Sequence, residues 1–226
     1  MPRSRTTRVS QGILRIVSRL LAVAVFRIRC NGREFIPKTG GGLLLSNHQS
    51  NLDPWLVGLC SDRFLSYLAR RTLFRFPPLG RTIAWFGAIP IDREGSGFGG
   101  VKETLRQLKQ GELVLMFPEG TRTLDGEVRA LKPGFCAIAK RCGLPLVPLA
   151  LDGPFEAWPR HRLIPRPAVI HVQFGAPLTP EEITAMTDEE LVAEVERRIR
   201  ICHAQTRQGR QSADARIRSV CSSATP

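Results

Sequence analysis

His48 and Asp53 are the two side chains in this sequence best suited to acid–base chemistry. They lie in the run Asn-His-Gln-Ser-Asn-Leu-Asp, which follows the apolar residues 43–45. Five positions correspond to about 140° of helical turn, so we expect His48 in a loop and Asp53 at the start of the next helix. A carboxylate on one imidazole nitrogen fixes the tautomer and leaves the other nitrogen as a general base. The alternative interpretation is that Asp53 only caps the helix that Pro54 opens.

A second group of polar residues follows an apolar stretch of the same kind. The run Phe-Pro-Glu-Gly-Thr-Arg occupies residues 117–122 and comes directly after residues 113–116. Glu119 can bind a hydroxyl or a guanidinium group, Gly120 lets a ligand approach the backbone, and Arg122 offers a planar fork that matches a phosphate. The alternative is an ordinary turn after a strand, with a surface arginine.

Other cations can converge on the same place. Arg93 follows the stretch Ala-Ile-Pro-Ile-Asp, whereas Arg70 and Lys132 stand elsewhere in the chain. Several cations around one pocket favour a substrate that carries a phosphate, although each of them alone is also typical of a solvated surface charge. No serine or cysteine occupies a nucleophile motif such as Gly-x-Ser-x-Gly, so we expect His48 to activate a hydroxyl of the substrate.

The elements that must position these residues alternate along the chain. We expect strands at short apolar runs and helices where apolar residues recur at helical spacing. The predicted strands cover residues 43–46, 64–68, 88–92, 112–117, 145–151 and 171–175, and the predicted helices cover residues 54–60, 101–110, 134–142 and a stretch after residue 187. Thr179 and Thr187 each precede a glutamate by three positions, as in a capping box. This alternation indicates an α/β fold with a mostly parallel or mixed central sheet flanked by helices.

The two ends of the chain carry its net charge of +13. Residues 1–30 contain seven arginines and no acid, residues 197–226 contain seven arginines and one aspartate, and the other 166 residues hold 19 basic and 19 acidic side chains. We expect residues 31–205 to form one folded domain and residues 206–226 to be a basic, disordered tail. Basic ends on a neutral body favour contact with an anionic surface and argue against a nucleic-acid-binding protein.

Residues 1–30 have the pattern of a segment that lies on a membrane. Arg15 and Arg19 share one face of a predicted helix, and apolar side chains can cover the other side. The uninterrupted apolar run, residues 20–26, is seven residues long, whereas about 20 are needed to span a bilayer. We expect a basic amphipathic helix in the headgroup plane of an anionic membrane. The alternative is a helix that packs on the domain and leaves its arginines in water.

The remaining motifs exclude other classes of site. The six cysteines form no Cys-x-x-Cys pair, and the four histidines have no zinc-ligand spacing, so we expect reduced cysteines and no metal. Residues 95–100 match a dinucleotide-binding pattern, but the run follows three charged residues instead of the strand itself, and we interpret it as a loop beside the site. The aromatic-rich residues 73–86 are consistent with an acyl groove, a membrane-facing surface or ordinary core.

Four of these blocks, in their order along the chain, resemble the glycerolipid acyltransferase family, and within it the bacterial 1-acylglycerol-3-phosphate acyltransferases. The blocks are His48 with Asp53, residues 87–93, residues 117–122 and residues 144–148. The resemblance covers roughly residues 25–180. The chain departs from the family pattern where Arg70 replaces a lysine and Thr123 replaces a common serine.

The resemblance implies the transfer of an acyl group from a thioester of coenzyme A or acyl carrier protein to the sn-2 hydroxyl of 1-acylglycerol 3-phosphate, which yields phosphatidic acid. His48 would be the general base and Asp53 would orient it, with no covalent acyl-enzyme and no cofactor. The substrate-binding residues that it implies are Arg70, Arg93, Glu119, Gly120, Thr121, Arg122, Lys132 and Pro148. The expected location is peripheral, on the cytoplasmic side of the inner membrane.

Three rival functions stay open from the sequence. No residue that we can name selects the headgroup, so another lysolipid such as lyso-ornithine lipid could be the acceptor. A non-catalytic, peripheral membrane-binding protein is a rival of a different class, and the intact His48, Asp53, Glu119 and Arg122 argue against it. A nucleic-acid-binding protein fits poorly, because the body of the chain is neutral and contains only one tyrosine.

Overall fold

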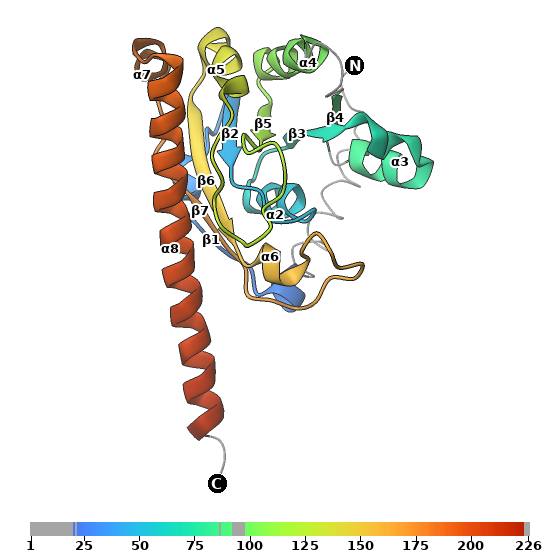
Figure 1. Ribbon diagram of the computed structural model, residues 1–226, viewed down its shortest axis with the longest axis vertical. Helices are drawn as coiled ribbons and strands as arrows, with labels where there is room; N and C mark the ends of the chain where they lie inside the picture. The colour runs from blue at the N-terminus through green and yellow to red at the C-terminus, as the bar shows by residue number, and fades with distance from the viewer. Residues whose placement is uncertain (1–19, 21, 86, 92–97, 224–226) are drawn as a thin grey trace.

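The sheet of this protein brings the ends of its central strands to one edge (Figure 1). The computed structural model describes residues 20, 22–85, 87–91 and 98–223, and the strand order of its sheet is β1-β7-β6-β2-β5-β3-β4. The strands are β1 (Arg29–Asn31), β2 (Gly42–Ser46), β3 (Leu65–Arg70), β4 (Ala88–Ile91), β5 (Leu113–Met116), β6 (Leu146–Asp152) and β7 (His171–Phe174). Neighbouring strands run parallel except for β6 and β7, so the predicted mixed α/β sheet is confirmed.

Helices cover both faces of this sheet, as Figure 1 shows. The helices are α2 (Asp53–Cys60), α3 (Pro77–Trp85), α4 (Phe98–Lys109), α5 (Cys136–Cys142), α6 (Pro154–Ala157), α7 (Pro180–Ala185) and α8 (Asp188–Ser223), with 3-10 turns at Arg33–Phe35, Arg71–Arg75 and Pro133–Phe135. Successive residues of β2 point to opposite faces: Leu44 packs in the core under α2, whereas Leu43 and Leu45 pack in the core under α4, α5 and α8. The continuous apolar run of β2 is therefore explained by burial on both sides.

The predicted helix starts are confirmed in detail. The Thr179 hydroxyl accepts a hydrogen bond from the backbone N–H of Glu182, and Thr187 does the same for Glu190. Each glutamate in turn accepts from the backbone N–H of its threonine. The apolar stripe predicted for the last helix is buried against the sheet: Leu191, Val195, Ile199 and Cys202. Local hydrogen bonding and periodicity thus set these elements.

The prediction of a disordered tail after residue 205 is wrong for the described residues. Helix α8 continues to Ser223, and Thr206 is buried. Arg207 and Arg210 form ion pairs with Asp152 at the end of β6. The composition of this stretch alone suggests disorder, since the sequence pattern does not show which carboxylate its arginines meet. That carboxylate, Asp152, lies more than fifty positions earlier in the chain.

The N-terminal boundary at residue 30 also needs correction. Phe26 is buried in the domain core, and β1 pairs with β7 from Arg29 onward. A strand of three residues is too short to show an alternating pattern, which is why the sequence did not reveal it. Most of the predicted amphipathic helix lies outside the described residues, although residues 20 and 22–26 are helical. In the described part of the chain, no helix combines the length and the apolar character required to cross a bilayer.

A chain truncated after Gln205 should unfold more easily than one truncated after Ser212. The shorter chain loses Arg207 and Arg210 and leaves the buried carboxylate of Asp152 without their guanidinium groups. Removing one side of a buried ion pair costs about 3–5 kcal/mol. Denaturant unfolding of both truncated chains measures the difference, and equal free energies of unfolding would contradict this role of α8.

Candidate active site

The candidate active site lies at the edge where β2 and β5 end. These strands are parallel neighbours with Leu45 opposite Met116, so the residues that follow them emerge together. As a result, the backbone N–H of His48 donates to Glu119 Oε1 at 3.2 Å, although the two residues are 71 positions apart. The structure thus joins the two motifs that the sequence presents separately.

One oxygen of Asp53 organises the loop between β2 and α2. Asp53 Oδ2 lies 2.8 Å from His48 Nδ1 and accepts hydrogen bonds from the backbone N–H groups of Gln49 at 2.6 Å and Ser50 at 2.8 Å. Asp53 is the first residue of α2 and is fully buried. Because a carboxylate only accepts, Nδ1 carries the proton, and His48 Nε2 is left to accept one. The carboxylate therefore holds both the loop backbone and the ring.

Two contacts from the segment after β5 fix the position of His48. Phe117 stacks on the imidazole ring with 4.0 Å between centroids and 19° between planes. The backbone N–H of Thr123 donates to the carbonyl oxygen of His48 at 2.8 Å. The His48 side chain keeps 19% of its surface exposed. The ring is thus oriented by its neighbours and is still reachable by a substrate.

Glu119 is a buried carboxyl group with one unused oxygen. Its Oε1 accepts from the backbone of His48, and the backbone of Arg129 also hydrogen-bonds to the carboxylate. Its Oε2 has no partner among the described residues. Burial raises the pKa of Glu119 to about 8, against the opposing effect of the two backbone hydrogen bonds. The carboxyl group is therefore largely protonated at neutral pH and has a hydrogen to donate.

Gly120 and Lys132 form a small cationic surface beside Glu119. Gly120 has a φ of +74°, and a Cβ at this position would lie 3.3 Å from Lys132 Nζ. The backbone N–H of Lys132 donates to the carbonyl oxygen of Pro118 at 3.0 Å, which brings the lysine back to this loop. The absence of a side chain at Gly120 thus leaves room at the ammonium group for a ligand oxygen. Thr121 and Arg122, both half-buried, continue the same loop.

Three of the predicted substrate-binding residues are not placed in this cluster. Pro148 lies in the middle of β6, opposite Leu45, and its carbonyl oxygen accepts from Gly175. Pro148 is therefore a residue of the sheet, level with the last residue of β5, and β6 extends four residues beyond it to Asp152. Arg70 is the last residue of β3, and its side chain is not among those that the structure describes. Arg93 and much of the glycine-rich run lie outside the described residues.

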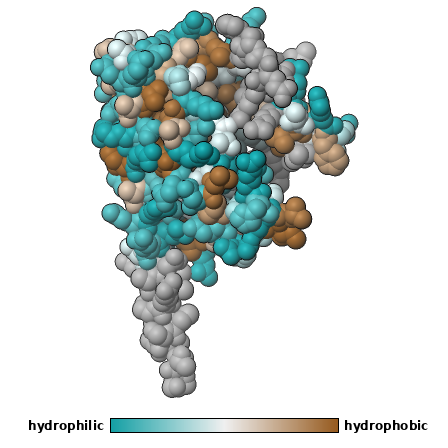
Figure 2. Space-filling view, viewed as in Figure 1, coloured by the Kyte–Doolittle hydropathy of each residue, from teal (hydrophilic) through white to brown (hydrophobic). Residues whose placement is uncertain are grey.

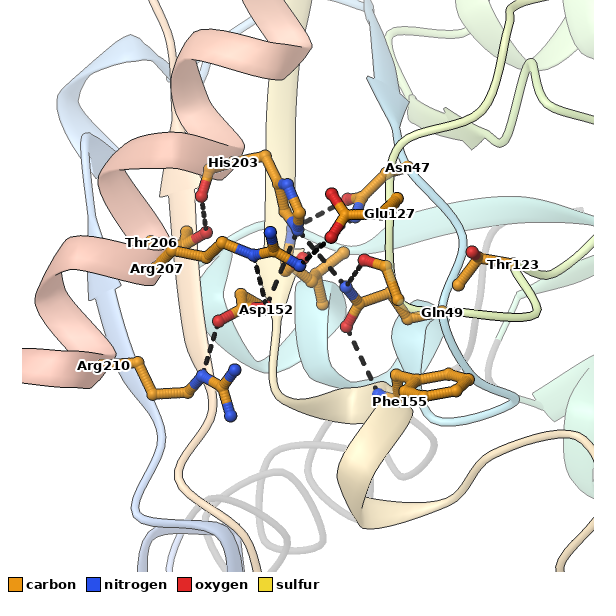
Figure 3. Close-up of polar contacts among 12 residues, drawn as sticks. Asn47, Gln49, Thr123, Glu127, Asp152, Phe155, His203, Thr206, Arg207 and Arg210 are labelled. Atoms are coloured by element: carbon orange, nitrogen blue, oxygen red, sulfur yellow. Dashed lines mark hydrogen bonds and ion pairs between the residues drawn. The ribbon is translucent and has the colours of Figure 1, made fainter. Parts of the chain in front are cut away.

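The sequence interpretation missed two side-chain amides, those of Asn47 and Gln49, that anchor the loop between β2 and α2 to neighbouring segments (Figure 3). The Asn47 side chain bonds both the N–H and the carbonyl oxygen of Leu151, each at 2.9 Å. The Gln49 side chain donates to the carbonyl oxygen of Gly126 at 2.8 Å and accepts from the N–H of Phe155 at 3.3 Å. Both amides are buried. Their place directly after a buried strand was the signal in the sequence, since polar groups there must find partners.

A cluster of charged residues connects this loop to α8, as Figure 3 shows. His203 Nε2 lies 3.4 Å from Gln49 Nε2 and 3.6 Å from Asp152 Oδ1. Burial raises the pKa of Asp152, but the hydrogen bond from His203 and the positive charge of Arg210 outweigh it, and the pKa is lowered. Asp152 therefore stays ionised and holds α8 against the end of β6, next to the residue that follows His48.

Two buried cysteines of the domain, Cys136 and Cys202, are not activated as nucleophiles. Burial raises the pKa of both Cys136 and Cys202 to about 11, so their thiols stay protonated at neutral pH. Within the described residues, no group of three or more histidine, cysteine or acidic side chains is arranged to hold a metal ion. The arrangement that remains is one oriented imidazole beside a protonated carboxyl and a cationic loop.

Comparison with known proteins gives a consistent family. The family model described as Acyltransferase matches residues 27–152, more than half of the chain. The 1-acyl-sn-glycerol-3-phosphate acyltransferase of Limnanthes douglasii is 31% identical over 160 residues, which is 70% of this chain and 56% of the plant protein. The protein of the same name from Pseudomonas aeruginosa is 33% identical over 165 residues, 70% of this chain and 62% of that protein. The one from Bacillus subtilis is 33% identical over 128 residues, 56% of this chain and 63% of that protein.

A solved structure shares the fold. The 1-acyl-sn-glycerophosphate acyltransferase PlsC from Thermotoga maritima superposes with a TM-score of 0.76 at 23% identity, covering 91% of this chain and 84% of that one. The chain matches only about 56–63% of the length of the relatives named above. The match to the solved structure shows that the two chains share their overall fold.

Replacing Glu119 with Gln should flatten the pH dependence of stability. The folded state holds the Glu119 proton up to pH about 8, whereas the unfolded chain loses it near its ordinary pKa of 4.5. Unfolding therefore releases a proton in this window, and the free energy of unfolding falls as the pH rises from about 4.5 to about 8. Denaturant unfolding at pH 5, 6.5 and 8 should show this fall reduced in Glu119→Gln. Parallel curves for the two proteins would refute the protonated state.

Proposed function

Since the chain belongs to the Acyltransferase family, we propose that it transfers an acyl group from a thioester to the free hydroxyl of a lysophospholipid. The proposed acceptor is 1-acylglycerol 3-phosphate and the product is phosphatidic acid, because the bacterial relatives from Bacillus subtilis and Pseudomonas aeruginosa carry the name of that activity. The observation that carries the proposal is the 2.8 Å contact between His48 Nδ1 and the buried Asp53. It gives the site an oriented base with part of its ring open to a substrate.

The chemistry needs one base and one leaving thiol. His48 Nε2 accepts the proton of the acceptor hydroxyl while the hydroxyl oxygen attacks the carbonyl carbon of the thioester. The new C–O bond forms, the C–S bond breaks, and the proton passes to the sulfur, which leaves as a thiol. Asp53 holds the Nδ1 proton throughout and stabilises the imidazolium. No protein side chain carries the acyl group.

The cationic loop suits the phosphate of the proposed acceptor. Lys132 offers an ammonium donor beside Gly120, and Arg122 lies two residues further on. The protonated carboxyl group of Glu119 can donate to an oxygen of the glycerol backbone from its unused side. Arg70, Arg93 and Thr121 belong to the same proposed surface on the grounds of the family pattern alone. Coenzyme A and acyl carrier protein are both suitable carriers of the thioester.

We also propose that the protein binds peripherally to the cytoplasmic side of the inner membrane. The exposed Leu20 and Val23, on a helix that follows five arginines, support contact with an anionic lipid surface. An acceptor without a phosphate, such as lyso-ornithine lipid, is the second candidate, since the base and its partners do not depend on the headgroup. A non-catalytic lipid-binding protein would not require His48 to be oriented by a buried carboxylate.

Replacing His48 with Ala should abolish thiol release from acyl-coenzyme A in the presence of 1-acylglycerol 3-phosphate. Loss of a general base costs about 10²- to 10⁴-fold in turnover, and His48 is held mainly through its backbone and one carboxylate, so the fold should survive. The assay follows free thiol, with circular dichroism as the control for folding. Turnover near that of the unaltered protein would overturn the assignment of the base. If both proteins are silent, the assay is repeated with an acyl carrier protein thioester.

Replacing Lys132 with Ala should raise the KM for 1-acylglycerol 3-phosphate by roughly tenfold, because a charge-assisted hydrogen bond to the phosphate is lost. The KM for the acyl donor should change little. Lys109→Ala, which removes an exposed lysine from α4, is the matched control for net charge. The same loss with lyso-ornithine lipid, which has no phosphate, would contradict the phosphate-binding role of Lys132.

A further inference from the structure

The loop between α6 and β7 presents two exposed aliphatic side chains. Leu163 is 93% exposed and Ile164 is 78% exposed, and neither packs against the core clusters of the domain. Figure 2 shows an apolar protrusion where Figure 1 places this loop. Two adjacent aliphatic residues in water are an unfavourable surface unless another apolar phase covers them.

The base of this loop is hydrogen-bonded, so its tip is held away from the domain. The Trp158 indole N–H donates to the carbonyl oxygen of Arg162 at 2.9 Å. The backbone N–H of Arg166 donates to Ala157 at 2.8 Å, and its guanidinium donates to the carbonyl oxygen of Glu156 at 2.7 Å. These bonds close the loop on both sides of the apolar pair.

The charges of the loop are all of one sign. Arg160, Arg162 and Arg166 surround the apolar pair, and no acidic residue occurs between Glu156 and Glu181. An apolar tip flanked in the sequence by arginines matches a bilayer with anionic headgroups, which offers hydrocarbon below a layer of negative charge. An apolar protein partner would not require this excess of positive charge.

The end of the loop meets the N-terminal helix. The backbone N–H of Ile170 donates to the carbonyl oxygen of Phe26 at 3.1 Å, and Arg29 donates to Ile170 at 2.9 Å. Leu20 and Val23, which are 66% and 56% exposed, precede Phe26 on that helix. Two exposed apolar sites, far apart in sequence, therefore come from neighbouring segments of the fold.

The start of the loop is bonded to the candidate active site. Ser50 Oγ donates to the carbonyl oxygen of Trp158 at 2.8 Å, and Ser50 follows His48 by two positions. Leu163 is five residues beyond Trp158, a distance of at most about 18 Å along the chain. The Ser50–Trp158 hydrogen bond therefore links the loop that carries His48 to the segment that leads into the exposed tip.

We propose that residues 159–167 form a membrane-docking loop. Leu163 and Ile164 insert among the lipids of an anionic bilayer, while Arg160, Arg162 and Arg166 contact the headgroups. The loop thereby brings the edge of the sheet that carries His48 to the membrane surface. Only this last role rests on the proposed function, because binding to the bilayer is a property of the loop itself.

The test is flotation of the 226-residue chain with substrate-free vesicles of phosphatidylcholine alone or with phosphatidylglycerol. The double variant Leu163→Gln/Ile164→Gln should lower the partition coefficient on anionic vesicles by about tenfold or more. Ile201→Gln, which alters an exposed aliphatic residue on α8, is the matched control and should stay within about twofold. A double variant that floats like the unaltered protein would overturn the proposal.

The charge of the loop is tested separately. Replacing Arg160, Arg162 and Arg166 with Gln should remove most of the preference for anionic over neutral vesicles, at about fivefold per arginine. An unchanged preference would overturn the role of the cations. Leu163→Trp provides a direct readout of insertion, since its fluorescence should shift to the blue on anionic vesicles and be quenched by lipids brominated on the acyl chains. An indole that stays in water would refute insertion.

Activity then separates this proposal from the proposed function. The double variant should turn over 1-acylglycerol 3-phosphate in detergent solution like the unaltered protein, and should lose turnover only when the acceptor is embedded in vesicles. Lost vesicle binding in a chain without any transferase activity would support the loop and refute the function. Equal turnover of the vesicle-embedded acceptor by both proteins would refute the role of the loop in presenting the site to the membrane.

Discussion

A single buried carboxylate oxygen, Asp53 Oδ2, is the constraint on which the site depends. It is removed from water and accepts hydrogen bonds from two backbone N–H groups and the His48 ring at 2.6 to 2.8 Å. These donors offset the cost of burying the carboxylate, whose other oxygen, Oδ1, has no partner among the described residues. The loop must therefore fold back over the start of α2 to supply them, and this same fold presents the imidazole. Stability of the loop and orientation of the base follow from one interaction.

The parallel sheet converts this local loop into a site by placing other segments beside it. Because β2 lies between β5 and β6, the loop after β2 contacts the loops after both neighbours. From the β5 side, Glu119 and Thr123 bind the two backbone groups of His48. From the β6 side, Leu151 holds the amide of Asn47. The base is thus fixed by contacts that span more than a hundred residues of sequence, and a rigid sheet is what keeps them in register.

The distribution of charge serves two separate purposes in this fold. Inside the domain, Arg207 and Arg210 neutralise Asp152 and hold α8 on the sheet. At the surface, the arginines of residues 159–167 flank exposed aliphatic side chains in the sequence, with no acidic residue among them. The same residue type is structural where it meets a buried carboxylate and interfacial where it meets apolar surface. The net charge of the chain does not distinguish these roles.

The sequence alone determined what depends on near neighbours. Periodicity predicted six of the seven strands, and capping residues predicted the starts of two helices. The loop of four residues between His48 and Asp53 made their contact one of two interpretations of the motif. Tertiary structure decided the rest: the placement of Pro148 within β6, the helical continuation that carries Arg210, the burial that protonates Glu119, and the exposure of Leu163. Each of these depends on contacts between segments that are far apart in the sequence. A short sequence pattern does not determine how far a side chain is buried when the chain folds.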